Sequence, residues 1–172
     1  MRSFSILPED DHRHSLQPGE REVFYFQLTS PDGAVFGFLR TSFDHERVTE
    51  GVTLSIDGLA CEYQCETQLA RNARPGADAS GPTLTLTCLK PWNNWRCRFS
   101  GVVPEIGTQN GLQVDVELSF AAVNTPTHYL VGDYHRVQQD GLLNGRLRVG
   151  AETWEGELVC YRDHSWGRRS VD

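Results

Sequence analysis

The sequence has no hydrophobic run long enough to cross a membrane as a helix. Such a run needs about 18 consecutive apolar residues, whereas the apolar blocks of this 172-residue chain are short and interrupted by charge. The N-terminal stretch MRSFSILPEDDHRHSLQPGE contains acids and histidines and lacks the apolar segment of a secretory signal. We therefore expect neither a membrane span nor export, and the expected location is the cytoplasm.

The sequence also has fewer basic than acidic residues. Lys and Arg number 16 against 23 Asp and Glu, and the net charge is −7 at pH 7. Proteins that bind nucleic acids or anionic membrane surfaces carry a concentrated basic patch, so neither partner is expected. The length and a hydrophobic content of 38% are typical of one globular domain. We predict a single domain over residues 1–172.

Recognisable disulfide and metal motifs are absent as well. The five cysteines are an odd number, and without export the expected state is the free thiol. In an extended segment, Cys61 and Cys65 would be about 13 Å apart, twice the span of a disulfide. Acids and histidines at residues 10–14, 133 and 135 have spacings that metal ligands use, but they lie in turn-rich or terminal stretches where such residues are usually solvated. We predict buried thiols, no metal and no cofactor.

Alternation of residues with a period of two dominates the chain, and long helical patterns are nearly absent. The turn signals Pro31-Asp32-Gly33 and Asp57-Gly58 separate alternating segments in the manner of hairpins. About ten strands are predicted, over residues 21–30, 34–43, 52–56, 59–70, 83–89, 95–103, 112–120, 134–139, 142–149 and 152–162. This number favours an antiparallel β-barrel of about 8–10 strands over a sandwich of seven, with an interior that holds side chains or one small ligand.

The densest group of chemically useful residues is the run YRDHSWG at residues 161–167. If the preceding strand continues through it, Tyr161 and Asp163 face one side, and Arg162, His164 and Trp166 face the other. Asp163 and His164 then need partners elsewhere: a cation or backbone N–H for the acid, and a carboxylate or carbonyl for the imidazole. A serine nucleophile is not expected, because the chain has no Gly-x-Ser-x-Gly elbow here.

The peptide RDHSWG at residues 162–167, preceded by QDG at 139–141 and GRL at 145–147, resembles the signature of a lipocalin-like group. This group contains AttH-like proteins and hydroxyneurosporene synthase (carotenoid 1,2-hydratase), and the segment 91–101 resembles it more loosely. The resemblance implies a lipocalin-like barrel, here in a single-barrel form, and apolar isoprenoid or polyketide-like ligands. Relatives of this kind commonly continue into a second barrel, so a homodimer that completes the ligand site is a further expectation.

The chemistry implied by the resemblance is protonation of an alkene, followed by water addition or ring closure. Burial in a dry cavity raises the pKa of a carboxyl group enough for this role, and aromatic faces stabilise a developing cation. We expect Asp163 as the acid, with His164 as second candidate. The expected ligand-binding residues are Trp92, Trp95, Trp154, Tyr161, Arg162 and Trp166.

The predicted function is binding of a hydrophobic small molecule of terpenoid, carotenoid or polyketide-like type in the barrel. Cofactor-independent, acid-assisted cyclisation, hydration or isomerisation would follow. One alternative is a carrier without catalysis. Another is a structural module with a filled barrel, in which Arg162 and Asp163 pair and Trp166 plugs the end.

Overall fold

The computed structural model describes residues 6–69, 75–108 and 110–168. A 3₁₀ turn, η1 (Pro8–Asp11), precedes ten strands, and within these ranges no helix is long and apolar enough to cross a membrane. The strands are β1 (Arg21–Thr29), β2 (Val35–Phe43), β3 (Arg47–Ile56), β4 (Leu59–Gln68), β5 (Thr85–Lys90), β6 (Asn94–Pro104), β7 (Gly111–Ala122), β8 (Thr127–Val131), β9 (Tyr134–Val149) and β10 (Glu152–Gly167).

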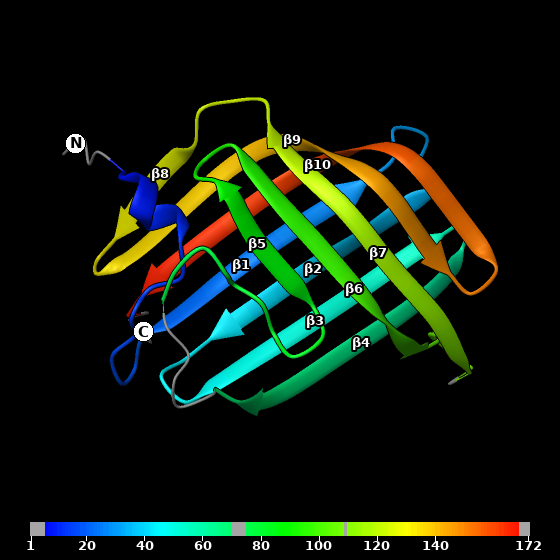
Figure 1. Ribbon diagram of the computed structural model, residues 1–172, viewed down its shortest axis with the longest axis horizontal. Coiled ribbons are helices and arrows are strands. Elements are labelled where there is room, and N and C mark those ends of the chain that lie inside the picture. Colours follow the sequence, from blue (N-terminus) through cyan, green and yellow to red (C-terminus); the bar gives the residue numbers. More distant parts are fainter. Residues whose placement is uncertain (1–5, 70–74, 109, 169–172) are drawn as a thin grey trace.

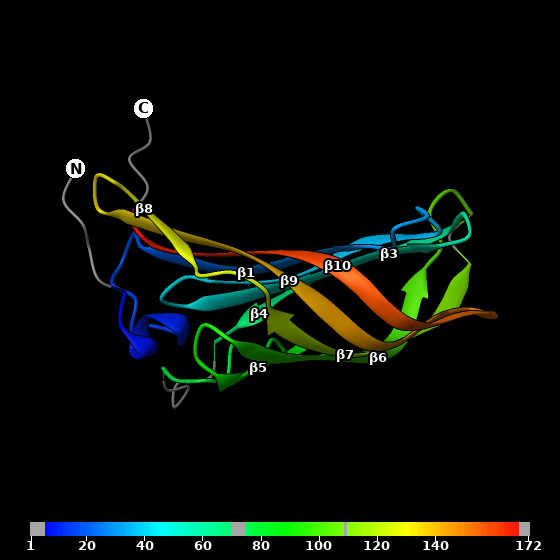
Figure 2. The same cartoon turned by 90° about the horizontal axis from the view of Figure 1, so that it is seen from above.

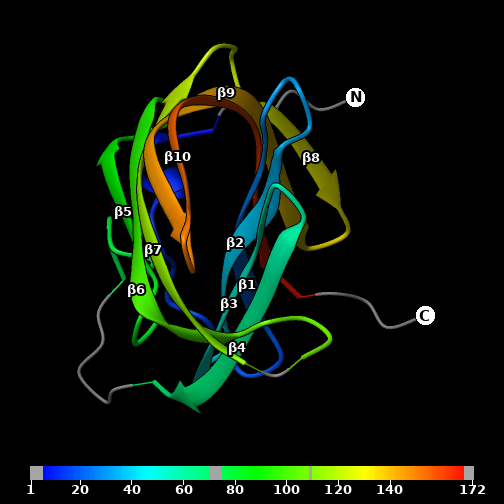
Figure 3. The same cartoon turned by 90° about the vertical axis from the view of Figure 1, so that its right-hand side faces the viewer.

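All ten strands belong to one antiparallel sheet (Figure 1), in the order β4-β3-β2-β1-β10-β9-β7-β6-β5, with β8 paired to β9. The sheet curls until β4 meets the end of β6 (Figure 3). There Cys61 bridges to Glu105, and the Ile106 N–H donates a hydrogen bond of 2.9 Å to the Ala60 carbonyl. This curled sheet confirms the all-β, lipocalin-like architecture predicted from the alternation.

The alternation also explains what fills the interior. In β1 the side chains of Phe24, Phe26 and Leu28 point inward and are fully buried, while Val23 and Tyr25 face outward. Inward-facing side chains of every strand except β8 join them in one hydrophobic cluster. Apolar burial of this kind is the main favourable contribution to folding. These side chains fill the space between the opposing walls of the barrel.

The structure corrects the predicted strands over residues 127–149, and β3 begins at Arg47, five residues before the predicted strand 52–56. The predicted strands 134–139 and 142–149 form one strand, β9, and the expected break at Gly141 lies inside the ladder. A Cβ atom at Gly141 would lie 2.2 Å from a ring carbon of Phe120, so close packing, and not a turn, requires the glycine. Strand β8 was not predicted; it is short and mostly exposed, and it lacks the alternation of a half-buried strand.

The two halves of β9 have different neighbours. Its C-terminal half pairs with β7, whereas its N-terminal half pairs with β8. The β8–β9 hairpin therefore separates from β5, β6 and β7, and it bends towards the outer side of β1 and β2 (Figures 2 and 3). On this outer side, residues of β1, β2, β9 and β10 line a cleft.

Candidate functional site

The RDHSWG peptide forms the end of β10, between β1 and β9. Arg162 and His164 lie opposite Phe26 and Phe24 of β1 and point into the barrel. Asp163 lies opposite Tyr25 and points outward with Tyr161. The structure thus places the two expected catalytic residues, Asp163 and His164, on opposite faces of the sheet. No single ligand can contact both side chains without crossing the sheet.

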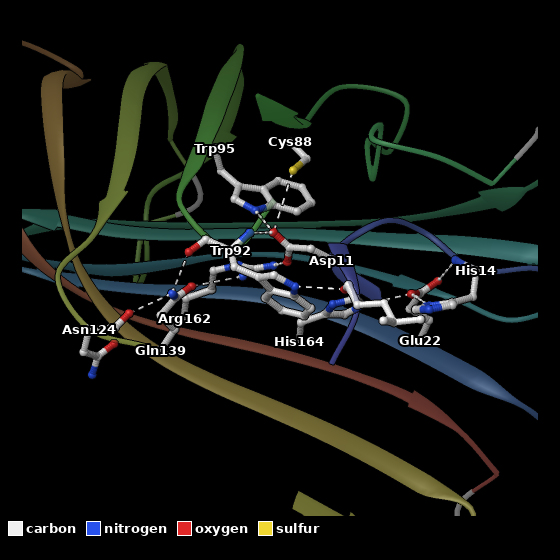
Figure 4. Close-up of polar contacts among 11 residues, drawn as sticks. Asp11, His14, Glu22, Cys88, Trp92, Trp95, Asn124, Gln139, Arg162 and His164 are labelled. Atoms are coloured by element: carbon white, nitrogen blue, oxygen red, sulfur yellow. Dashed lines mark hydrogen bonds and ion pairs between the residues drawn. The ribbon is translucent and has the colours of Figure 1, made fainter. Parts of the chain in front are cut away.

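On the inner face, Arg162 forms an ion pair with Asp11 of η1, and both side chains are buried (Figure 4). The Asp11 carboxylate also accepts hydrogen bonds from the Trp92 backbone N–H at 2.6 Å and from the Trp95 indole N–H at 3.0 Å. The Asp11 carboxylate of η1 thus binds groups from β10, from the β5–β6 turn and from β6. This pairing corrects the expected Arg162–Asp163 pair.

Aromatic rings surround the Arg162 guanidinium. Its Cζ lies 4.7 Å from the ring centroid of Trp95 and 5.8 Å from that of Trp92. Gln139 accepts a hydrogen bond from Arg162 at 3.5 Å and donates one to the Trp92 carbonyl at 2.9 Å. Cation–π contacts of this type are strongest where the cation is desolvated. Two expected ligand-binding residues, Trp92 and Trp95, thus both contact a third, Arg162, in the packed end of the barrel.

A second inner group joins His14, Glu22 and His164. Oε1 of the buried Glu22 lies 2.6 Å from Nδ1 of His14 and 2.8 Å from Nε2 of His164. Burial acts to raise the pKa of Glu22, but the hydrogen bonds of His14 and His164 outweigh it and hold that pKa below its usual value. Burial lowers the pKa of His164. At neutral pH the group therefore contains a carboxylate and an uncharged, buried imidazole.

Trp166 extends this group into a stack of rings. Its indole lies 4.7 Å from the His14 ring and 4.9 Å from the His135 ring, measured between centroids. His128 stacks on His135 at 5.2 Å. Burial and the neighbouring His128 lower the pKa of His135. Trp166 thus connects the N-terminal segment to the β8–β9 hairpin.

The outer face carries a cleft of about 420 Å³. Its lining consists of aromatic rings, two arginines and the outward residues of the RDHSWG peptide: Val23, Tyr25, Phe38, Arg40, Tyr134, Arg136, Tyr161, Asp163 and Ser165. We call it the outer cleft. Asp163 pairs with Arg136 at 2.5 Å, and the Tyr134 hydroxyl donates to Ser165 at 2.6 Å. Burial, followed by the Asp163 charge, raises the pKa of Tyr161.

The expected site residues therefore divide into three groups. Asp163 and Tyr161 line the outer cleft. Trp92, Trp95, Arg162, His164 and Trp166 lie in the inner networks. Trp154 lies near the other end of β10, packed against the hydrophobic cluster.

Sequence reasoning missed several partners in both regions. Glu22 carried a usable signal, because its position in β1 has the same parity as Phe24 and Phe26 and so predicts an inward-facing acid. Asp11 belongs to the acids and histidines at residues 10–14, whose spacing resembles that of metal ligands and does not indicate a pair with Arg162. The cleft residues Phe38 and Arg40 carried no comparable signal, since outward aromatic and basic residues are ordinary on a strand.

The fold defines a lipocalin-like, all-β barrel protein. The networks around Asp11 and Glu22 pack one end of the barrel, and the outer face of the sheet carries the outer cleft. A family model, described as a domain of unknown function (DUF7064), matches residues 7–172. The chain therefore belongs to the DUF7064 family. No curated protein and no solved structure matches it.

Proposed function

We propose that the protein binds a compact, ring-containing small molecule of polyketide-like type in the outer cleft, and that Asp163 transfers a proton to or from it. The observation that carries this proposal is the cleft of about 420 Å³, in which aromatic rings and two guanidinium groups surround one carboxylate. Small-molecule sites commonly have about 300–1,000 Å³ and combine apolar walls with a few polar groups.

The outer cleft is better supported as the binding site than the barrel interior. Inward-facing side chains such as Phe26, Leu39 and Trp95 are fully buried in one continuous cluster. A ligand in the interior would have to displace them, which costs the packing that stabilises the fold. A long carotenoid chain would also extend well beyond the outer cleft, so a compact ligand fits better.

The charges of the cleft favour a ligand with an acidic oxygen. Arg40 and Arg136 contribute two cations against the single carboxylate of Asp163. The rings of Tyr25, Phe38 and Tyr161 would contact the apolar part of the ligand. Guanidinium groups bind carboxylate and enolate-like oxygens through parallel hydrogen bonds.

The resemblance of the RDHSWG peptide to that of AttH-like proteins and carotenoid hydratases supports a catalytic role. A carboxylate held by Arg136 is placed to accept a proton from an acidic carbon of the ligand and return it to another carbon. Of the three reaction types expected, isomerisation by such a proton shuttle therefore fits Asp163 best. It needs only the carboxylate and the ligand. A carrier that binds the same ligand without turnover is the alternative.

The binding proposal is tested with 2-naphthoate, a compact aromatic carboxylate, by calorimetric titration of untagged protein. Arg136→Ala should weaken binding about tenfold or more, because it removes a cation from the cleft. Arg47→Ala is the matched control, since Arg47 forms exposed ion pairs with Asp44 at 3.2 Å and Glu66 at 3.1 Å and does not line the outer cleft. No saturable binding to the native protein, or an equal loss in both variants, would overturn the proposal.

Catalysis is tested separately from binding. Native mass spectrometry of the purified protein would identify a co-purifying ligand and would report whether the chain forms the homodimer expected from the sequence. Incubation of that ligand in deuterated water should then lead to isomerised, deuterium-labelled product. Asp163→Asn should abolish the label and retain binding. A bound ligand that stays unlabelled with the native protein identifies a carrier.

A further inference from the structure

Three metal-ligating side chains meet on the inner face, away from the outer cleft. They come from three separate segments: His14 lies between η1 and β1, Glu22 near the start of β1, and His164 near the end of β10 (Figure 4). Their ligand atoms all lie within 4.8 Å of one another. We propose that His14, Glu22 and His164 form a binding site for a divalent transition-metal ion of the Zn²⁺ class.

The donor set selects the type of ion. Two imidazole nitrogens and one carboxylate oxygen are typical ligands of Zn²⁺ and of related ions such as Co²⁺ and Fe²⁺. Mg²⁺ and Ca²⁺ prefer sites made only of oxygen atoms. Glu22 supplies the carboxylate oxygen, and His14 and His164 each supply a ring nitrogen.

The surrounding residues hold the three ligands in place. The Glu22 carboxylate accepts the His14 backbone N–H at 2.9 Å, which fixes the N-terminal segment against β1. The His164 ring stacks on Phe24 at 4.0 Å between centroids. The carboxylate of Asp10 lies 4.0 Å from Nε2 of His14, the ring nitrogen that faces away from Glu22. A carboxylate behind a ligating histidine is a common outer partner in metal sites and increases the basicity of the ligand.

Both imidazoles present a ring nitrogen to the same oxygen of Glu22. Nδ1 of His14 lies 2.6 Å and Nε2 of His164 lies 2.8 Å from Oε1. A carboxylate oxygen accepts two hydrogen bonds, so these atoms satisfy one another without a metal. A cation among the three atoms would replace the two hydrogen bonds with coordinate bonds.

The group also has a route to solvent. His14 is the one partly exposed member, with a quarter of its side chain accessible. It lines a pocket of about 190 Å³ together with Arg13, Phe43, Asp44 and His45. An ion can therefore enter beside His14, and a further coordination position can be filled by water from this pocket. Three protein ligands with an open position are typical of reactive metal sites.

The test uses untagged protein, treated with a chelator and then titrated with Co²⁺ and, separately, with Zn²⁺. We expect one equivalent of Co²⁺ to produce the visible absorption of a low-symmetry nitrogen and oxygen site. We also expect Zn²⁺, but not Mg²⁺, to raise the melting temperature. His14→Ala should weaken Co²⁺ binding about 100-fold or more, and Asp10→Asn about tenfold, as outer partners do. His45→Ala should bind as the native protein does.

His14→Ala is the main variant because His14 is partly exposed, so its loss leaves the core intact. Circular dichroism of this variant without metal checks the fold. The proposal is overturned if Co²⁺ produces no such absorption with the native protein, or if the absorption persists in His14→Ala. An equal loss of Co²⁺ affinity in His14→Ala and His45→Ala also overturns it. None of these outcomes depends on 2-naphthoate binding in the outer cleft, so the two proposals stand or fall separately.

Discussion

Arg162 and Asp163 are neighbours in the chain, yet their ion pairs lie on opposite faces of one β-sheet. Arg162 pairs with Asp11 inside the barrel, where both side chains are almost completely buried. Asp163 pairs with Arg136 on the outside, where the arginine is half exposed. One short peptide thus contributes to the packed end of the barrel and to the outer cleft, and substitutions should separate the two roles.

The first prediction compares these two ion pairs. Arg162→Met should lower the free energy of unfolding by about 3–5 kcal/mol, because it leaves the buried Asp11 carboxylate without its counter-ion. Arg136→Met should lower it less, by about 1 kcal/mol, since Arg136 is half exposed and solvent screens its charge. Urea unfolding followed by fluorescence measures both. A similar loss of unfolding free energy in the two variants would contradict the inner placement of Arg162.

A second prediction concerns pH. The folded-state pKa of His164 lies below its ordinary value of 6.5, so the unfolded chain binds a proton first as the pH falls. Stability should therefore decrease as the pH is lowered from 6.5 through the folded-state pKa of His164. Below 4.5 Glu22 adds to the loss, because its carboxylate contributes stability above that value and must be protonated on further acidification.

Urea unfolding of chelator-treated, metal-free protein at several pH values between about 7 and 5 tests this dependence, which follows from the linkage of protonation to folding. His164→Gln should flatten the pH profile of the unfolding free energy. His45→Gln, at an exposed histidine outside the group, should leave the profile unchanged. A profile that is equally steep in the native protein and in His164→Gln would show that another group governs the response.

The third prediction concerns a glycine inside the sheet. Gly145 has a φ of +147°, and an added Cβ would lie 2.0 Å from the Glu117 carbonyl oxygen of the adjacent strand. Gly145→Ala should therefore destabilise the protein by more than about 3 kcal/mol. Gly33 also has a positive φ but no neighbour at the Cβ position, so Gly33→Ala should cost only about 1–2 kcal/mol. Melting temperatures would rank the variants, and the reverse ranking would contradict the strand pairing.

Thiol labelling provides a fourth prediction. Cys61, Cys88, Cys97 and Cys160 are buried, and only Cys65 is partly exposed. Burial raises the pKa of Cys97 to about 12, and burial together with the Asp11 charge does the same for Cys88. Since the thiolate is the reactive form, Ellman's reagent at about pH 8 should label Cys65 alone in the folded protein. Rapid labelling of more than one thiol without denaturant would contradict the packing.

Much of the fold follows from local pattern. The period of two predicts the strands and the faces of Tyr161, Arg162 and Asp163, because successive side chains on a strand point to opposite sides. The turn at Asp57-Gly58 is also local, since both residues adopt a positive φ. These features need only neighbouring residues, and the structure confirms them.

The partners of the site residues depend on long-range geometry. Asp11 and Arg162 are separated by 151 positions, and their contact requires η1 to dock against Trp92 and Trp95. The Arg136–Asp163 pair requires the register of an unbroken β9 against β10. A strand break at Gly141 is incompatible with that register, so the pattern of the sequence does not predict the outer cleft.

The most direct test of the central claim is the location of a bound ligand. Intermolecular nuclear Overhauser effects between 2-naphthoate and the protein report which side chains the ligand contacts. The account predicts effects to the rings of Tyr25, Phe38 and Tyr161 in the outer cleft. Effects to Phe26 and Leu39 in the barrel interior, or an absence of effects to the cleft rings at saturating ligand, would contradict it.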